Sequence, residues 1–410
     1  MIDLGMLQKD QQLIERLKSK DPEFDIEKLF KLDEDRRSLM QQVEDLRSQK
    51  NDLAKAAQGG ITDEVRQQSI EIGKALKEKE KQFEEVAAEF KRLYLFCPNI
   101  PEAGIPVGGK EKNKVVKVVG EKPTFNFPIK NHVELGNELG WFDFEAAARM
   151  AGSQFALYKG DAVRLIYALT RMMLKNNVDH GFEPILPPYM VNAASLEVAS
   201  NFPKFKDDVY SIRDEDLYMT PTAEVNLTNL YRNAIIPVAE LPLRMTSWTS
   251  CFRREAGGYG ARERGLIRIH EFEKVELYAI TEPEKGSEEL ERMVACAETI
   301  LQKLGLHYRI SLLATGDMSF PSAKTFDIEV WMPGQEAYYE VSSCSDCTQF
   351  QARRGKIRYR KEVASKPELA STLNASSLAL PRLMVALMET YQKEDGRIDL
   401  PVDLKLYMDW

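Results

Sequence analysis

The sequence predicts an α+β protein in which an N-terminal antiparallel coiled-coil hairpin precedes a domain built on an antiparallel β-sheet with helices packed on it. Two observations predict this fold class. Near the N-terminus, two stretches of similar length carry apolar residues at heptad spacing. Further along the chain, strand-like runs come in close pairs around turns and alternate with helical segments, which favours antiparallel pairing.

Size and charge set the first limits on function. A chain of 410 residues is too long for one ordinary core, and 43% hydrophobic residues are enough to fold two domains. The net charge of -8 argues against nucleic-acid binding through overall charge, although a local basic strip on an acidic protein is still compatible with RNA binding.

The cellular compartment is predicted from the N-terminal segment, the hydropathy and the cysteines. The first turns are charged and lack an apolar run of signal-peptide length, and no later segment is long and apolar enough to span a bilayer. The five cysteines are an odd number and too scattered for a disulfide framework. We therefore expect a cytoplasmic protein with no membrane attachment.

The two heptad stretches cover residues 29–57 and 65–93, with a Gly59-Gly60 loop between them. Helices of this length that share an apolar seam predict a hairpin over about residues 27–95, roughly 40 Å long at 1.5 Å per residue. Its outer faces carry charges of both signs, and any single charge is expected to be a solvated surface residue. An arm of this length still indicates contact with a partner.

A segment over 97–114, dense in proline and glycine, is typical of a linker. The sequence therefore predicts an arm domain over 1–100, a linker over 101–116 and a second domain over 117–410. In the second domain the helical segments are 161–177 and 288–304. The strand-like runs are 183–186, 217–219, 266–272, 275–280, 326–331 and 337–342.

Several common binding motifs do not occur in the sequence. Cys344 and Cys347 form a CxxC, but no second pair follows and the four histidines are not spaced as metal ligands, so a structural zinc site is not expected. Neither a GxGxxG after a strand nor a GxxxxGK followed by Ser or Thr is present. A bound nucleotide would therefore have to be held by side chains.

A charged stretch over 251–276, CFRREAGGYGARERGLIRIHEFEKVE, offers such side chains. Residues two apart in a strand share a face, so Arg253 and Glu255 are expected to project together, as are Arg268, His270 and Phe272 on a returning strand. This arrangement can hold an anionic aromatic ligand, because arginine matches phosphate and a phenyl ring can stack on a base. A surface hairpin with cross-strand ion pairs explains the same charges.

Four other segments accompany this stretch in order along the chain. They are HGFEPILPPYMV over 180–191 with its proline at Pro188, PTAE over 221–224, YYEVSS over 338–343 and TLNASSLALPR over 372–382. With the arm in front, the series resembles the seryl-tRNA synthetases, a class II aminoacyl-tRNA synthetase family. The resemblance runs the whole chain and implies a class II synthetase-type antiparallel β-sheet catalytic domain flanked by helices.

The resemblance implies roles for individual residues. Arg253 would hold the α-phosphate of ATP, Arg382 the γ-phosphate and Phe272 the adenine, while Glu340 and Ser343 would hold Mg²⁺. The residues implied in catalysis are Arg253, Glu340 and Arg382. Those implied in ATP binding are Arg253, Arg254, Glu255, Phe272, Glu340, Val341, Ser342, Ser343 and Arg382. Those implied in L-serine binding are Thr222, Ala223, Glu224, Glu276, Asn374 and Ser376, of which Glu276 is expected to select the serine hydroxyl.

The resemblance also implies the reaction and the partners. ATP and L-serine would give seryl-adenylate and pyrophosphate, and serine would then pass to the 3' end of tRNA(Ser), and also of tRNA(Sec). No protein nucleophile is needed, because positioning and charge stabilisation suffice. A homodimer is expected, and the arm would lie across tRNA, with Arg47, Lys55 and Arg66 near its tip as candidate contacts.

Two motifs depart from the family's usual residues. The third motif reads Asn374-Ala375-Ser376-Ser377 and then Pro381-Arg382, where the family usually has Asn-Gly-Ser-Gly and Gly-Arg. The added proline disfavours helical geometry at the residue before it. The second-motif loop reads Gly-Ala-Arg-Glu at 260–263 where Gly-Arg-Asp-Thr is common. We expect activity with a slightly reshaped pocket floor and altered acceptor-stem contacts.

Two other interpretations account for part of the sequence. The chain could activate an amino acid for delivery to a carrier protein, although relatives of that kind lack the long arm. It could also be a coiled-coil interaction protein on a catalytically altered synthetase body. The presence of Arg253, Glu276, Glu340 and Arg382 argues against the second interpretation.

Overall fold

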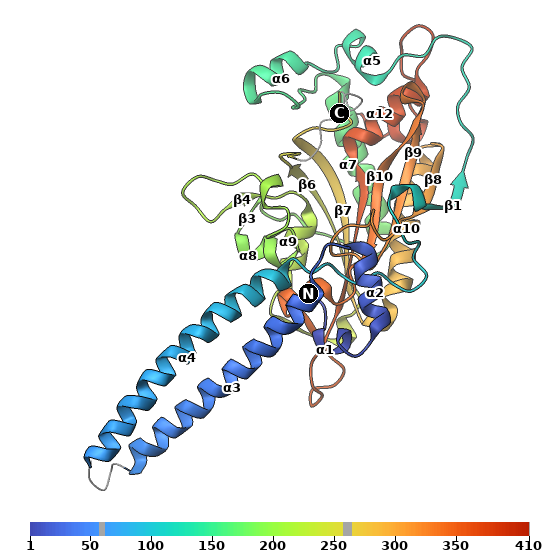
Figure 1. The fold of residues 1–410 in the computed structure, drawn as a ribbon. Helices are drawn as coiled ribbons and strands as arrows, with labels where there is room; N and C mark the ends of the chain where they lie inside the picture. Colours follow the sequence, from blue (N-terminus) through green and yellow to red (C-terminus); the bar gives the residue numbers. More distant parts are fainter. Residues whose placement is uncertain (57–61, 257–264, 410) are drawn as a thin grey trace. The chain divides into compact units, whose positions relative to one another are not determined.

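The computed structural model describes residues 1–56, 62–256 and 265–409. The chain divides into two compact units, Met1–Pro98 and Asn99–Trp410, which are coloured along the sequence in Figure 1. Among the described residues, no helix has both the length and the apolar composition that crossing a membrane requires.

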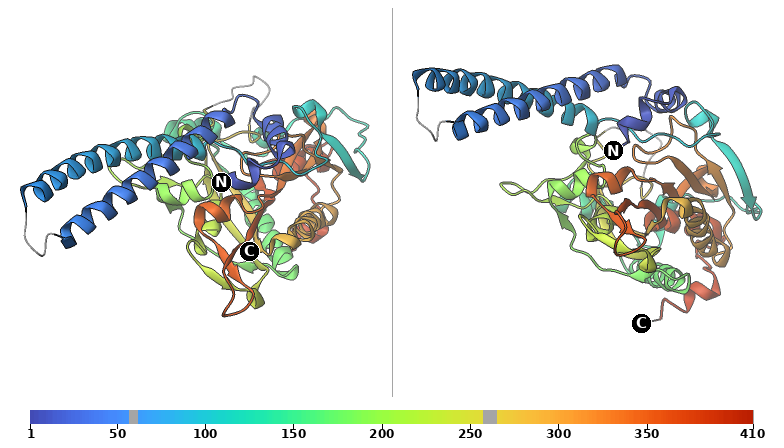
Figure 2. Two further views of the ribbon diagram at one scale, coloured as in Figure 1. Left: turned by 60° about the horizontal axis from the view of Figure 1, so that its bottom comes forward. Right: turned by 90° about the horizontal axis from the view of Figure 1, so that it is seen from below.

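The first unit is helical. Two short helices, α1 (Leu4–Leu7) and α2 (Gln11–Lys20), precede the long helices α3 (Ile26–Ala56) and α4 (Asp63–Leu95). In both views of Figure 2, α3 and α4 run side by side in opposite directions. Leu29, Val43 and Leu76 are buried in their seam, at positions that the heptad pattern predicts. The coiled-coil hairpin is therefore confirmed, whereas its Gly59-Gly60 loop lies outside the described residues.

The second unit is built on an eight-stranded sheet with the order β1-β8-β9-β10-β13-β7-β6-β2. All neighbours pair antiparallel except β2 and β6, which are parallel. Its strands are β1 (Lys114–Val119), β2 (Glu183–Pro184), β6 (Leu243–Phe252), β7 (Glu271–Thr281), β8 (Tyr308–Leu312), β9 (Lys324–Met332), β10 (Ala337–Asp346) and β13 (Ser371–Ala379). This arrangement confirms the predicted α+β class.

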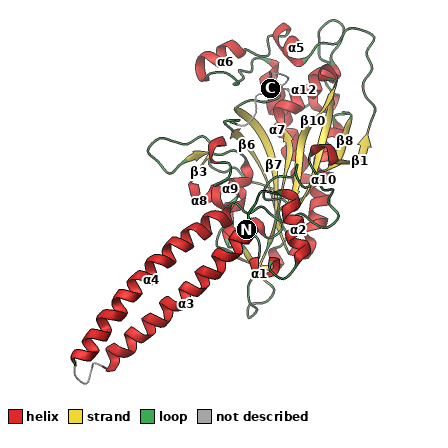
Figure 3. Cartoon of the chain, viewed as in Figure 1, coloured by secondary structure: helices red, strands yellow, loops and turns green. Residues whose placement is uncertain are grey.

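Three long helices pack on one face of this sheet: α7 (Asp161–Asp179), α10 (Gly286–Lys303) and α12 (Leu380–Tyr391). They appear in red beside the yellow strands in Figure 3, and the largest hydrophobic core lies between them and the sheet. The other helices are α5 (His132–Glu138), α6 (Phe144–Ala151), α8 (Ala193–Val198), α9 (Ala223–Leu230), α11 (Phe350–Gly355) and α13 (Val402–Lys405). The smaller strands are β3 (Met190–Val191), β4 (Tyr218–Met219), β5 (Ile235–Pro237), β11 (Arg358–Arg360) and β12 (Glu368–Leu369).

Alternation along the central strands separates the core from a polar face. On β7, Val275 and Leu277 belong to the core beneath the helices, and Glu276 between them faces a cavity on the other side. On β13, Ala375 joins the same core while Asn374 lines the cavity. The period of two in the sequence thus places the polar residues of both motifs on one surface.

One predicted strand is wrong. Of residues 266–272, only Glu271 and Phe272 lie in β7, and 266–270 run irregularly. The Leu266 amide donates to Nε2 of His132 at 3.2 Å instead of pairing with a strand. The apolar residues of this stretch are buried because it crosses the core, so their pattern does not reflect strand pairing.

The other side of the predicted hairpin also differs. Strand β6 ends at Phe252, so Arg253 and Glu255 follow the strand and do not alternate within it. Glu255 adopts a left-handed conformation with φ of 49°, which is uncommon outside glycine and clusters at functional sites. The remaining predicted strands overlap β2, β4, β7, β9 and β10, and the two predicted helices overlap α7 and α10.

At two other places the local structure differs from what the sequence predicts. Residues 101–116, predicted as a linker, lie within the second unit, and β1 begins at Lys114. Helix α12 begins at Leu380 although Pro381 follows it. Proline is accommodated here because the first-turn N–H that it lacks has no partner within a helix.

Candidate active site

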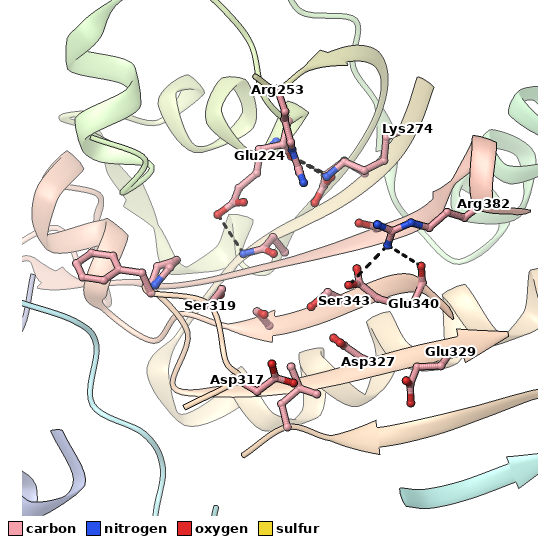
Figure 4. Close-up of a pocket in the computed structure, with 18 of the residues that line it drawn as sticks. Glu224, Arg253, Lys274, Asp317, Ser319, Asp327, Glu329, Glu340, Ser343 and Arg382 are labelled. Carbon is pink, nitrogen blue, oxygen red and sulfur yellow. Dashed lines mark hydrogen bonds and ion pairs between the residues drawn. The ribbon is translucent and has the colours of Figure 1, made fainter. Parts of the chain in front are cut away.

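A cavity of about 580 Å³, which we call the main pocket, opens on the sheet face away from the three long helices. Figure 4 shows side chains from several elements converging on it. They include Thr222, Glu224, Arg253, Lys274, Glu276, Asp327, Glu340, Ser343, Asn374, Ser376 and Arg382. The main pocket therefore joins residues from all the motifs that follow 180–191 in the sequence.

The first turn of α9 places Glu224 in the main pocket. Thr222 is the N-cap of α9, and its Oγ1 accepts the Glu224 N–H at 3.3 Å. Oε1 of Glu224 accepts hydrogen bonds from Gln351 Nε2 at 2.6 Å and Asn374 Nδ2 at 3.2 Å. Both donors are neutral amides. Burial, and next the charge of Glu276, raise the pKa of Glu224 to about 7.

The surroundings of Glu276 differ from those of Glu224. It is 2% exposed, and its carboxylate forms an ion pair with Lys274, which is 6% exposed. Thr222 Oγ1 donates to Glu276 Oε2 at 3.2 Å and accepts from Lys274 Nζ at 2.8 Å. This end of the pocket thus holds one carboxylate with a cation and another, Glu224, with only neutral donors. A small ligand that carries an ammonium group and a hydroxyl would complement it.

A β-bulge explains how Glu340 and Ser343 face the same pocket. The register of β10 against β9 shifts between Glu340 and Ser342, so one extra residue separates the pocket positions. Without the shift, residues three apart would point to opposite faces. Asp327 on β9 lies opposite Ser343, and its Oδ1 is buried without a hydrogen-bond partner in the described part of the chain. Burial, and next the charge of Glu340, raise the pKa of Asp327.

Two arginines line the main pocket, Arg253 beside Glu224 and Lys274 and Arg382 farther along, as Figure 4 shows. Arg382 Nη1 donates to the Glu340 carbonyl at 2.9 Å and lies 3.8 Å from its carboxylate, as the dashed lines of Figure 4 indicate. Arg382 Nε donates to the Ile267 carbonyl at 3.2 Å. Arg253 lies with its guanidinium 5.2 Å from the centre of the Phe272 ring. Both guanidinium groups can bind phosphate oxygens.

A smaller pocket of about 70 Å³ adjoins these arginines. Phe272, Arg268 and Glu255 line it, and Glu255 Oε2 accepts from Arg268 Nε at 2.6 Å. An apolar ring beside two guanidinium groups suits a planar base attached to phosphates.

Four of the residues implied by the resemblance line neither pocket. Arg254 is exposed and its amide donates to the Asp208 carbonyl at 2.8 Å. Ala223, Val341 and Ser342 are buried, and Ser342 Oγ donates to the Ser376 carbonyl at 2.5 Å. These three side chains contribute to packing, whereas the other implied pocket residues line one or both pockets.

The candidate tRNA contacts lie on α3 and α4. Arg47 is paired with Glu80 across the two helices at 2.8 Å, and Lys55 is paired with Asp52 at 3.4 Å. Arg66 is exposed on α4. The loop at 260–263, where the second motif departs from the usual residues, lies outside the described residues.

Several residues of the main pocket are not predicted from the sequence. Lys274 shares a face with Glu276 by strand alternation, and this signal was available in the sequence. Asp327 is brought in by the pairing of β9 with β10. Lys110 and Asn113 line the pocket from the segment predicted as a linker, and Asn113 Nδ2 donates to Asp317 Oδ2 at 2.7 Å. The sequence carries no signal for these last three contacts.

Comparison with known proteins identifies the family. The family model of the seryl-tRNA synthetase N-terminal domain matches residues 1–101. The family model of the class II tRNA synthetase core domain (G, H, P, S and T) matches residues 205–391. A serine--tRNA ligase of Desulfotalea psychrophila is 44% identical over 389 residues, which is 92% of each chain. The chain belongs to the seryl-tRNA synthetase family. A serine--tRNA ligase of Nitratidesulfovibrio vulgaris is 42% identical over 416 residues, covering 100% of this synthetase and 98% of that one.

A solved structure agrees with this assignment. The crystal structure of seryl-tRNA synthetase from Pyrococcus horikoshii complexed with ATP matches with a TM-score of 0.92 and 34% identity, covering 100% of this chain and 98% of that one. The predicted family and fold class are therefore confirmed. The alternative of an interaction protein on an altered synthetase body is not favoured.

Proposed function

We propose that this seryl-tRNA synthetase activates L-serine with ATP and transfers the serine to tRNA(Ser). The observation that carries the proposal is the composition of the main pocket. One end holds Glu224 and the Glu276–Lys274 pair with Arg253 beside them, and Arg382 lies farther along the pocket. A serine ammonium and hydroxyl fit the two carboxylates, and the phosphates of ATP fit the two arginines.

Serine selection follows from the two carboxylates. We assign the substrate ammonium to Glu224, because its existing partners are neutral amides. We assign the hydroxyl to Glu276, whose charge Lys274 already compensates. An alanine substrate would leave the acceptor unpaired, at a cost of about 1 to 3 kcal/mol. Asn374 and Ser376 complete this end.

ATP and Mg²⁺ are assigned to the remaining residues. Arg253 and Arg382 would bind phosphates, and the base would stack on Phe272 in the smaller pocket. Glu340, Ser343 and Asp327 offer oxygen donors of the kind that Mg²⁺ prefers, and the unpartnered Oδ1 of Asp327 fits a cation nearby. When bound, Mg²⁺ would neutralise phosphate charge. The serine carboxylate then attacks the α-phosphorus and pyrophosphate leaves, with no protein nucleophile.

The remaining assignments concern partners and organisation. We assign tRNA binding to the arm over 1–100 and catalysis to 117–410, with 101–116 joining them. Arg66 and Lys55 are the arm residues that we assign to tRNA, and Arg47 also joins the two helices through Glu80. We further propose a cytoplasmic homodimer that also charges tRNA(Sec). The arm argues against delivery to a carrier protein.

Charging of isolated tRNA with labelled serine tests the proposal. Serine should be incorporated into tRNA(Ser) and tRNA(Sec) transcripts when ATP and Mg²⁺ are supplied, and chelation of Mg²⁺ should stop the reaction. A tRNA for another amino acid is the control. Incorporation of another amino acid, or none with either transcript, would refute the assignment.

A further inference from the structure

A buried amide at the end of α7 lies behind the strands that carry residues of the main pocket. Asn177 is fully buried, and its Nδ2 donates to Thr246 Oγ1 on β6 at 2.9 Å. Thr246 Oγ1 in turn donates to the backbone carbonyl of Glu276 on β7 at 2.9 Å. Two hydrogen bonds therefore link α7 to the backbone of the residue that we assign to the serine hydroxyl.

The same amide also forms a hydrogen bond with strand β13. Oδ1 of Asn177 accepts from Ser377 Oγ on β13 at 2.8 Å and from the Cys296 thiol at 3.3 Å. Ser376, which lines the main pocket, pairs with Glu276 across β13 and β7, and the register of β13 shifts directly after it. Asn177 thus lies below the point where β6, β7 and β13 meet at the serine end of the pocket.

The hydrogen bonds of Asn177 require an amide. Its Nδ2 supplies a donor to Thr246 and its Oδ1 accepts from Ser377, so both halves of the group are used. An aspartate would lack the donor, and a leucine would leave the Thr246 and Ser377 hydroxyls without this partner. Ser377 occupies a position where the family usually has glycine, and its buried hydroxyl needs the acceptor that Asn177 supplies.

We propose that Asn177 is a positioning residue for serine binding, which fixes the backbone of the Glu276–Ser376 strand pair from behind the sheet. The proposal rests on the proposed function, because it assigns serine to this end of the main pocket. Asn177 does not touch the pocket itself, and ATP is assigned to the two arginines and the smaller pocket, so the loss of Asn177 should affect the two substrates differently.

The test measures KM for serine and for ATP in serine-dependent ATP–pyrophosphate exchange with Asn177→Leu. KM for serine should rise roughly tenfold, the effect of losing about one buried hydrogen bond, while KM for ATP changes by less than about twofold. Thr170→Val is the matched control. Thr170 is also buried on α7, but its hydroxyl donates to the Ile166 carbonyl of the same helix at 2.8 Å.

Two single-atom variants keep the test valid if Asn177→Leu does not fold. Thr246→Val removes the relay to Glu276 and should raise KM for serine, whereas Thr246→Ser keeps the hydroxyl and should restore it. Equal increases in both KM values, or a Thr170→Val effect equal to that of Asn177→Leu, would overturn the proposal. Wild-type protein without serine-dependent exchange would instead refute the proposed function, which separates the two failures.

Discussion

Glu224 and Glu276 are two carboxylates in one pocket with opposite surroundings. Lys274 and Thr222 compensate the charge of Glu276, while Glu224 has two neutral amide donors. The raised pKa of Glu224 follows from this difference, because burial and the Glu276 charge both disfavour its ionised form. A substrate ammonium would remove that penalty.

Serine binding is therefore expected to depend on pH through Glu224. Its carboxyl must lose a proton to bind an ammonium, so KM for serine should fall as pH rises through about 7. The charges facing Glu224 are those of Glu276, Lys274 and Arg253. Steady-state exchange measured from about pH 6 to about pH 8 checks this. Glu224→Gln should raise KM and remove the pH dependence. An unchanged slope in that variant would contradict the assignment.

The stability of the folded protein should show the reverse dependence on pH. Because the folded-state pKa of Glu224, about 7, lies above its ordinary value of 4.5, the folded protein holds a proton that the unfolded chain releases between these values. Stability from this group is full below 4.5 and is lost as pH rises through about 7. The change in Tm that Glu224→Gln causes should therefore be more positive at about pH 8 than at about pH 4.5. Equal Tm shifts at both values would speak against a buried charge.

At the scale of single elements, irregularities place the functional side chains. The bulge in β10 brings Glu340 and Ser343 to one face, and the register shift in β13 follows Ser376. In a regular strand, either Glu340 or Ser343 would point into the core.

The bulge predicts different effects for adjacent serines. Ser343→Ala should raise the Mg²⁺ concentration needed for half-maximal exchange several-fold, because Ser343 faces the carboxylates of the pocket. Ser342→Ala is the control, since Ser342 is buried and donates to the Ser376 carbonyl. It should lower Tm with little change in the Mg²⁺ midpoint. A shift in the midpoint for Ser342→Ala alone would contradict the observed register.

A buried carboxylate joins α12 to α5. Oε1 of Glu389 accepts from the His132 amide at 3.0 Å and from Gln335 Nε2 at 3.0 Å, and Oε2 accepts from the Gly334 amide at 2.9 Å. His132 Nδ1 lies 3.1 Å from Oε1, so this ring nitrogen is the protonated one, and Nε2 accepts from Leu266.

Removing this carboxylate should destabilise the second unit. Glu389→Ala leaves several buried donors unpaired and is expected to reduce the free energy of unfolding by at least about 2 kcal/mol. Denaturant unfolding measures this, with the exposed Glu394→Ala as the control, which should stay within about 0.5 kcal/mol of wild type. Equal stability of the two variants would refute the role of Glu389.

The sequence predicts the regular parts of the fold and fails where tertiary structure overrides local pattern. Heptads identify α3 and α4, and alternation identifies β9 and β10. The apolar residues within 266–270 give the pattern of a strand, because the same residue types are buried in a core and in a sheet. Asp327 and Asn113 enter the pocket through long-range contacts that leave no local signal.

At the scale of the molecule, our assignments divide two tasks between the two units. Every residue that we assign to serine and ATP lies in Asn99–Trp410, and the arm residues that we assign to tRNA lie in Met1–Pro98. Amino-acid activation should therefore need only the second unit.

Replacing most of the arm by a short loop tests this division. A variant that lacks residues 36–85 should retain exchange within a few-fold of wild type, because the pocket residues are untouched. It should lose most of its tRNA charging at limiting tRNA, since a long surface for backbone contacts is removed. Full charging activity in this variant would show that the arm is dispensable.

The main pocket, as we propose, selects and activates serine. ATP–pyrophosphate exchange tests it most directly, with each amino acid supplied in turn, Mg²⁺ present and tRNA omitted. We predict exchange with serine, at least about tenfold less with alanine, and loss of the serine signal in Glu276→Ala. Exchange with another amino acid, or serine exchange that survives in Glu276→Ala, would contradict the assignment of this pocket to serine.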